Sequence, residues 1–111
     1  MSATDKVLIE AQDCPVAITV LYTTPASTRT KIDRFTATNT TGAPITLTVY
    51  LIPPAGTAGT SNMIVSAKSI AAGADEPITS PAGHTLAAGG AVAVVASGAG
   101  LTIRATGREY A

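Results

Sequence analysis

The sequence predicts a single all-β domain, an antiparallel β-sandwich of about eight short strands. Short apolar runs recur along the chain with Gly, Pro, Asn and Ser between them. Several of these runs alternate apolar and polar residues with a period of two, which is typical of strands with one buried face. No segment has a helical period of useful length, and 111 residues fit one hydrophobic core.

The first half of the chain holds the most regular alternation. We expect strands over residues 6–10, 16–23, 29–38 and 44–52. In the second of these, one face would carry Val16, Ile18, Val20 and Tyr22. In the third, Ile32 falls out of phase with Phe35, which predicts a β-bulge or two partly covered faces. In the fourth, Leu47 would point inward and Tyr50 outward.

Turn residues organise the rest of the chain. Residues 39–42, Asn-Thr-Thr-Gly, predict a hairpin, because Asn and Gly tolerate positive φ. Residues 55–62 predict a polar, flexible loop. Further short strands are expected over residues 63–67, 69–71, 77–79 and 85–87, and a final hairpin joins 91–96 to 101–106. We divide the chain into residues 1–13, an N-terminal arm or first edge strand, and residues 14–111, the β-sandwich domain.

Charge and hydropathy exclude several functional classes. Seven Lys and Arg balance seven Asp and Glu, so the formal net charge is zero. A nucleic-acid binder needs clustered positive charge to displace the counterions of the phosphates. No apolar run approaches the roughly 18–20 residues that span a bilayer. Residues 1–6 lack the basic and apolar regions of a secretory signal. We therefore expect neither a nucleic-acid nor a membrane partner.

The residues that most often carry chemistry are scarce. Cys14 is the only cysteine, so no internal disulfide is possible, and a lone thiol suits synthesis in a reducing cytosol. His84 is the only histidine, and no spacing proposes a zinc site. A Cys14–His84 dyad is conceivable, but a buried thiol and a turn histidine are the favoured interpretations. The adjacent acids Asp75 and Glu76 could bind a hard cation, but a solvated loop is the favoured interpretation because no further carboxylates are nearby in the sequence. We assign no catalytic, cofactor-binding or metal-binding residue.

Two surface features could serve an interface. Arg29, Lys31, Asp33 and Arg34 form a short charged stretch, interpreted as a mixed-charge solvent face with a partner-binding face as the alternative. Outward threonines would give a flat, uncharged sheet surface suited to packing against a neighbouring subunit, and they are Thr36, Thr38, Thr46 and Thr48.

Two stretches of the chain resemble a family of small virion proteins of tailed bacteriophages. The first is residues 32–51, with a strand, the Asn-Thr-Thr-Gly turn and an alternating strand that leads to Pro. The second runs from residues 86–92 to residues 103–109, and Thr106-Gly107-Arg108-Glu109 matches the Ser/Thr-Gly-x-Glu ending typical of these proteins.

The resemblance implies a jelly-roll-like sandwich that is a non-enzymatic structural part of a phage virion. The leading role is a capsid decoration (cement) protein or a head–tail-associated subunit. Such proteins act through multimeric assembly, so the implied partners are further copies, as a homotrimer, and other virion proteins such as the major capsid protein. No cofactor is implied, and the protein would reach the virion after synthesis in the host cytoplasm. Separately, the position of residues 1–13 ahead of the clearest strands suggests the hypothesis of an arm that reaches onto a neighbour.

A tail-fibre module that binds a receptor or carbohydrate is the alternative role. Carbohydrate-binding sandwiches usually stack exposed aromatic rings on sugars, and only Tyr22, Tyr50 and Tyr110 are available beside one Phe. A hydrolase is a distant third, because any catalytic pair would have to come from residues far apart in the sequence.

Overall fold

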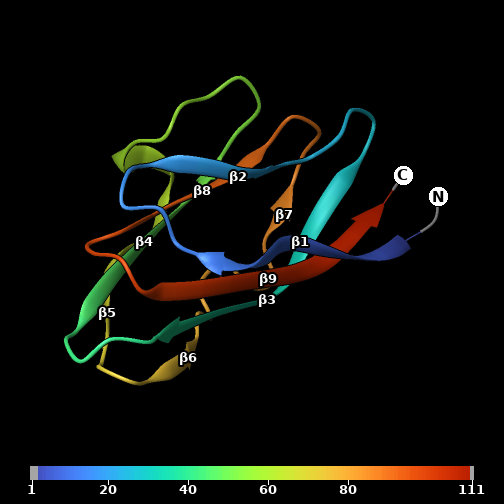
Figure 1. The fold of residues 1–111 in the computed structure, drawn as a ribbon. Coiled ribbons are helices and arrows are strands. Elements are labelled where there is room, and N and C mark those ends of the chain that lie inside the picture. Colours follow the sequence, from blue (N-terminus) through green and yellow to red (C-terminus); the bar gives the residue numbers. More distant parts are fainter. Residues whose placement is uncertain (1–2, 111) are drawn as a thin grey trace.

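Residues 3–110 of the computed structural model fold into two antiparallel β-sheets packed face to face (Figure 1). The strands are β1 (Ala3–Asp13), β2 (Thr19–Thr23), β3 (Arg29–Asn39), β4 (Ile45–Ile52), β5 (Met63–Ile70), β6 (Asp75–Pro77), β7 (Thr85–Leu86), β8 (Ala91–Ala96) and β9 (Leu101–Tyr110). A single 3₁₀ turn, η1 (Thr60–Asn62), precedes β5. Within the described residues no helix is long and apolar enough to cross a membrane.

The strand order is that of a jelly roll. The first sheet runs β1-β9-β3-β6, with β7 also paired to β3, and the second runs β2-β8-β4-β5. The two short strands β6 and β7 pair with opposite ends of β3, so together they fill one strand position. Eight positions in two four-stranded layers, linked by connections that cross between the layers, make a jelly roll. The predicted all-β antiparallel sandwich is confirmed.

Both predicted hairpins are wrong, because each turn joins strands of different sheets. Residues 39–42 lead from β3 in the first sheet to β4 in the second, and residues 97–100 lead from β8 to β9 in the reverse direction. The Asn39 amide, fully buried, holds the first corner. Its Nδ2 donates to the carbonyls of Ala43 at 2.7 Å and Ile70 at 3.0 Å, and its Oδ1 accepts from the Thr41 amide at 2.9 Å.

The core lies between the sheets, where alternate residues of β3, β4, β8 and β9 meet. Leu47, Val49 and Ile103 are fully buried there, as the alternation predicts. Tyr50 points away from this core, as predicted, but it is not exposed to solvent. Its ring is buried with Ile52 in a second cluster on the outer face of the second sheet, against Ala58 and Met63. Within the 55–62 segment, Ala58 therefore covers that ring, whereas residues 55–57 are exposed to solvent.

Irregular pairing explains which side chains turn inward. The register of β3 shifts between Ile32 and Arg34, which is the bulge that the phase change predicts. The register of β1 shifts between Val7 and Ile9, and as a result Leu8 and Ile9 both reach the core instead of pointing to opposite sides.

The N-terminal segment is part of the first sheet. Residues 3–13 form the edge strand β1, longer than the expected strand over residues 6–10, and pair with β9 from Ala3 opposite Tyr110 to Asp13 opposite Thr102. Leu8 and Ile9 are 6% and 1% exposed. Because this strand supplies core side chains, we expect its removal to destabilise the sandwich as well as any contact that it makes.

Candidate interaction surfaces

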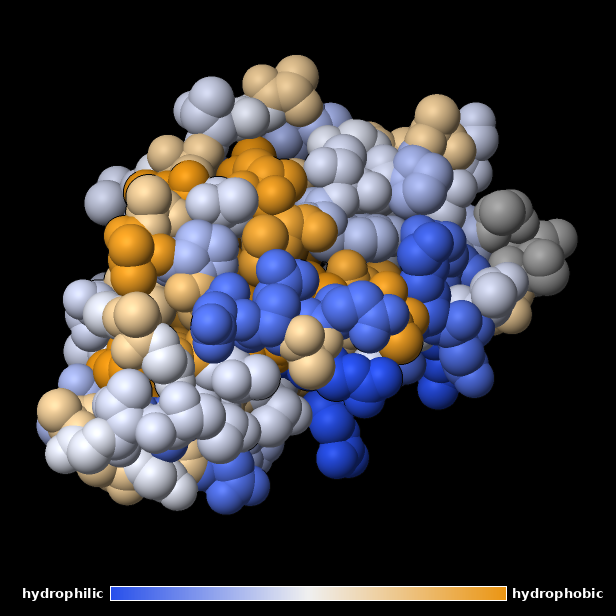
Figure 2. Space-filling model, in the orientation of Figure 1, coloured by the Kyte–Doolittle hydropathy of each residue, from blue (hydrophilic) through white to orange (hydrophobic). Residues whose placement is uncertain are grey.

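Three aliphatic side chains beside the free edge of the second sheet point into solvent. Val16, Ile18 and Val20 are 61%, 53% and 50% exposed, and we call them the apolar edge. They lie on β2 and on the segment before it, and β2 pairs with β8 alone. Figure 2 shows apolar side chains gathered over this part of the molecule.

A bulge creates the apolar edge. The sequence places Val16, Ile18 and Val20 on one face with Tyr22, but the register of β2 shifts between Val20 and Tyr22. Val20 therefore pairs with Ala93, which belongs to the outer cluster, while Tyr22 pairs with Val92 of the core. The strand itself starts only at Thr19, so the predicted strand over residues 16–23 is too long.

The apolar edge lacks the charges that usually protect exposed strands. No Asp, Glu, Lys or Arg occurs over residues 14–28. The longer strands at the other sheet edges carry charge: β1 has Asp5, Lys6, Glu10 and Asp13, and β5 has Lys68. The short edge strand β6 has Asp75 and Glu76, whereas the two-residue strand β7 has no charge. Charges on edge strands oppose pairing with other chains, and this edge has no such protection.

The outer face of the first sheet is polar and contains a groove of about 420 Å³. The polar residues of its lining alternate along two neighbouring strands, and we call this the threonine groove: Arg34, Thr36 and Thr38 on β3, with Thr102, Arg104 and Thr106 on β9. The pairing sets Thr36 opposite Arg104 and Thr38 opposite Thr102. Thr46 and Thr48, expected on the same surface, lie on β4 in the other sheet.

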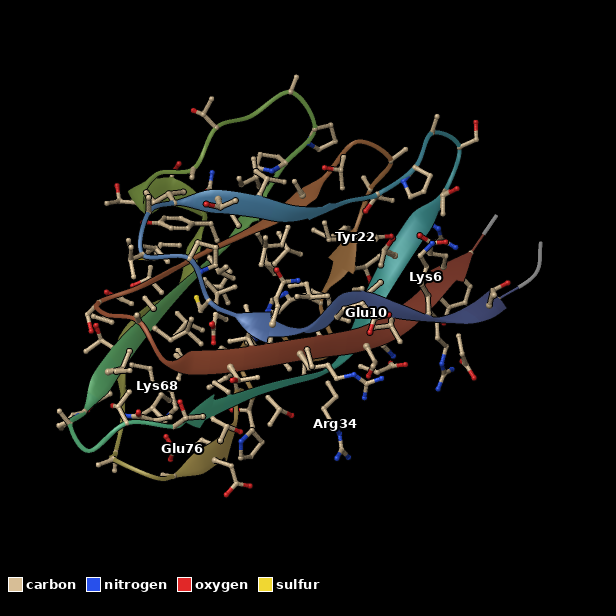
Figure 3. The ribbon with its side chains drawn as sticks, viewed as in Figure 1. Lys6, Glu10, Tyr22, Arg34, Lys68 and Glu76 are labelled. Carbon is tan, nitrogen blue, oxygen red and sulfur yellow. The ribbon has the colours of Figure 1, made fainter. Side chains whose placement is uncertain are left out.

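The charged side chains of β3 do not act as one group, because each has different neighbours. The Arg108 guanidinium of β9 lies 3.2 Å from Asp33 and 3.7 Å from Asp5 of β1, and these carboxylates raise its pKa, Asp33 most. The Arg29 guanidinium lies over the Tyr110 ring at 5.9 Å from its centre. Arg34 projects from the outer side of β3 (Figure 3).

A tyrosine and a glutamate link the two sheets near the chain ends. The Tyr22 hydroxyl donates to Glu109 Oε2 at 2.5 Å and lies 2.8 Å from the Thr30 hydroxyl, while Lys6 Nζ is 3.7 Å from Glu109 Oε1. Burial, together with the hydrogen bond to Glu109, raises the pKa of Tyr22 to about 12. This link fastens β2 in one sheet to β3 and β9 in the other.

The Thr-Gly-x-Glu ending has a structural explanation in these contacts. Gly107 lies where a β-carbon would stand 2.1 Å from the Lys31 carbonyl oxygen, so only glycine lets β9 and β3 approach this closely. Glu109, two residues on, is the acceptor for Tyr22.

The aromatic rings expected to stack on sugars are mostly unavailable. Tyr22 and Tyr50 are 9% and 6% exposed, so neither presents a face to solvent. Tyr110 is partly exposed but lies beneath Arg29. The expectation that Tyr22 and Tyr50 could stack on a sugar ring is therefore wrong.

Cys14 and His84 lie too far apart to act together. Cys14 donates its amide to Leu101, which pairs with Asn39, while the His84 carbonyl accepts from Ile32. Ile32 and Asn39 are separated by seven positions of β3, roughly 23 Å of strand. Cys14 is buried as expected, and burial raises its thiol pKa to about 11. His84 is exposed in the turn before β7.

The acidic pair lies at the edge of the first sheet. Asp75 and Glu76 belong to β6, not to a loop. Among residues 3–110 there is no group of three or more His, Cys, Asp and Glu that could hold a metal ion.

The fold has a solved viral counterpart. No family model and no curated protein matches this sequence. A chain of the structure of the infectious bursal disease virus Gx strain matches 97% of this chain with a TM-score of 0.51 and 15% identity. The match covers 31% of that longer chain, so the present chain corresponds to about a third of it. At this identity the likeness shows the fold.

Proposed function

We propose that this chain is a non-enzymatic structural subunit of a virus particle that acts through multimeric assembly. More specifically, we propose a phage capsid decoration or head–tail-associated subunit. The observation that carries the proposal is an unprotected apolar edge on a jelly roll whose fold recurs in a viral structure. The phage setting rests on the resemblance of residues 32–51 and 103–109 to small virion proteins.

The apolar edge favours assembly for an energetic reason. Fully burying a Val or Ile side chain contributes about 1.5–3 kcal/mol, so covering side chains that are half exposed contributes about 1 kcal/mol each. Val16, Ile18 and Val20 together would then supply on the order of 3 kcal/mol per copy when a neighbour covers them. Soluble monomers seldom keep such residues together without a partner.

The two outer faces suggest how a subunit is oriented. The second sheet carries the apolar edge beside an apolar cluster around Ile52, whereas the first sheet carries the threonine groove and the charged pairs. We infer that copies contact one another at the apolar edge, as a homotrimer, and that the first sheet remains available for other virion proteins such as the major capsid protein. Charged residues are only 13% of the chain and the net charge is zero, so self-repulsion is weak.

The test is the molar mass in solution, by light scattering over a concentration series. The native chain is expected at a multiple of its 11.0 kDa, and Ile18→Asp is expected to shift it to the monomer without loss of the β-sheet circular dichroism spectrum. Ser66→Asp, at an exposed position of β5, is the matched control and should keep the multimer. If Ile18→Asp and Ser66→Asp behave alike, the apolar edge is not the interface.

A further inference from the structure

The threonine groove contains two arginines with no carboxylate of their own. Arg34 and Arg104 are exposed, and no Asp or Glu among residues 3–110 lies within ion-pairing distance of either. Three carboxylates of this sheet contact other cations instead, since Asp33 and Asp5 both lie against Arg108 and Glu109 pairs with Lys6. Two like charges left close together on one face of a sheet repel each other. A ligand with two negative charges would relieve that repulsion.

The spacing of the two arginine positions on the sheet restricts which ligands can face both side chains. Thr36 is directly opposite Arg104, and Arg34 lies two residues away on the same face of β3. Diagonal neighbours of this kind are about 7–8 Å apart. In an extended peptide, side chains at positions i and i+2 share a face and are separated by about 6.6–6.8 Å. Two acids at alternate positions of an extended segment would therefore face the two arginines together.

The rest of the groove suits an extended peptide. Thr36, Thr38, Thr102 and Thr106 surround the arginines with hydroxyls that both donate and accept hydrogen bonds. Single-stranded nucleic acid needs stacking aromatic rings and a longer run of cations, and the groove lining has neither. Its lining residues spread along one face of two neighbouring strands, which suits a segment lying along the sheet.

We propose that the threonine groove binds an extended, acidic segment of another protein, with Asp or Glu at alternate positions, through Arg34 and Arg104. No two acids in residues 1–111 are separated by one residue, so this stretch of a second copy does not supply the alternating acids, and we assign the occupant to a different protein. Planar guanidinium groups bind carboxylates in a paired geometry, which favours arginine at such a site. The inference rests on the proposed function only in placing this partner in the same particle.

The test is an NMR titration of the ¹⁵N-labelled full chain with two synthetic peptides of equal composition. One is Thr-Glu-Thr-Glu-Thr, and the other is Thr-Glu-Glu-Thr-Thr, in which the acids are adjacent. The alternating peptide is expected to shift the amide signals of residues 34–38 and 102–106, to bind several-fold more tightly than the adjacent-acid peptide, and to weaken as salt is added. Inorganic phosphate serves as a third ligand.

Matched variants complete the experiment. The double variant Arg34→Gln and Arg104→Gln should weaken binding of the alternating peptide about tenfold, as two exposed ion pairs would. Lys68→Gln removes a cation from β5 of the other sheet and should leave binding unchanged. Equal binding of both peptides, tighter binding of phosphate, or an equal loss in Lys68→Gln would overturn the proposal. Because these measurements do not involve Ile18, the proposal for the threonine groove and the proposal for the apolar edge can each be contradicted without affecting the other.

Discussion

Gly107 offers the sharpest test of how the sheets are built. A β-carbon at this position would stand 2.1 Å from the Lys31 carbonyl oxygen and 3.0 Å from Leu8 Cδ1. The first contact is with backbone in the middle of a strand pair, so relief requires β3 to move by about 1 Å. Overpacking of a well-packed core usually costs about 1–3 kcal/mol, and a backbone clash belongs at the upper end. We expect Gly107→Ala to lower the free energy of unfolding by about 3 kcal/mol in urea denaturation followed by circular dichroism.

Gly98→Ala is the matched control for this experiment. Gly98 lies in the corner between β8 and β9, where a β-carbon would meet nothing within 4 Å. This substitution should be neutral, or stabilising by about 0.4–1 kcal/mol through the smaller entropy of the unfolded chain. The reasoning is refuted if Gly107→Ala is as stable as the native protein, or if both substitutions destabilise it equally.

Four further predictions follow from buried groups. Leu47→Ala should destabilise the fold by about 2–5 kcal/mol in the same urea assay, because it leaves a cavity between the sheets. Tyr22→Phe should lower the free energy of unfolding by about 2 kcal/mol, because it removes the hydrogen bond to the Glu109 carboxylate. Unfolded tyrosine loses its proton near pH 10 and folded Tyr22 near pH 12, so stability should fall between these values, less steeply in Tyr22→Phe. The Cys14 thiol should react with a disulfide reagent only in urea, and rapid reaction of the folded protein would contradict its burial.

Period-two alternation predicts strands well wherever one face is buried. β4 carries it most clearly, and the inward positions of Leu47 and Val49 follow from the sequence alone. The bulge in β3 is visible as a phase change between Ile32 and Phe35. In these strands the local pattern is sufficient to predict which side chains point inward, because one face of the strand is buried along its length.

The local pattern does not show which distant strands pair with each other. Residues 39–42 have the composition of a hairpin turn, yet the buried Asn39 amide binds the Ile70 carbonyl and the chain changes sheets. The inward position of Tyr22 depends on a bulge between Val20 and Tyr22. This bulge is not visible in the sequence, because the two residues follow the regular period-two alternation.

The candidate surfaces were predictable only in part. The uncharged run over residues 14–28 is plain in the sequence and could have indicated an unprotected edge. By contrast, Arg34 and Arg104 are seventy residues apart, and only the register of β3 against β9 brings them into one groove. The same register supplies Arg108 to Asp33, a pairing that the short charged stretch of β3 does not reveal.

The most direct test of the structural role is the protein composition of purified particles. The measurement is quantitative mass spectrometry of particles of the virus that carries this gene, purified by density gradient, with antibody labelling in electron micrographs. The account predicts that the chain is present in many copies per particle and that the label decorates the particle surface. Abundant chain in infected cells together with its absence from purified particles would contradict it.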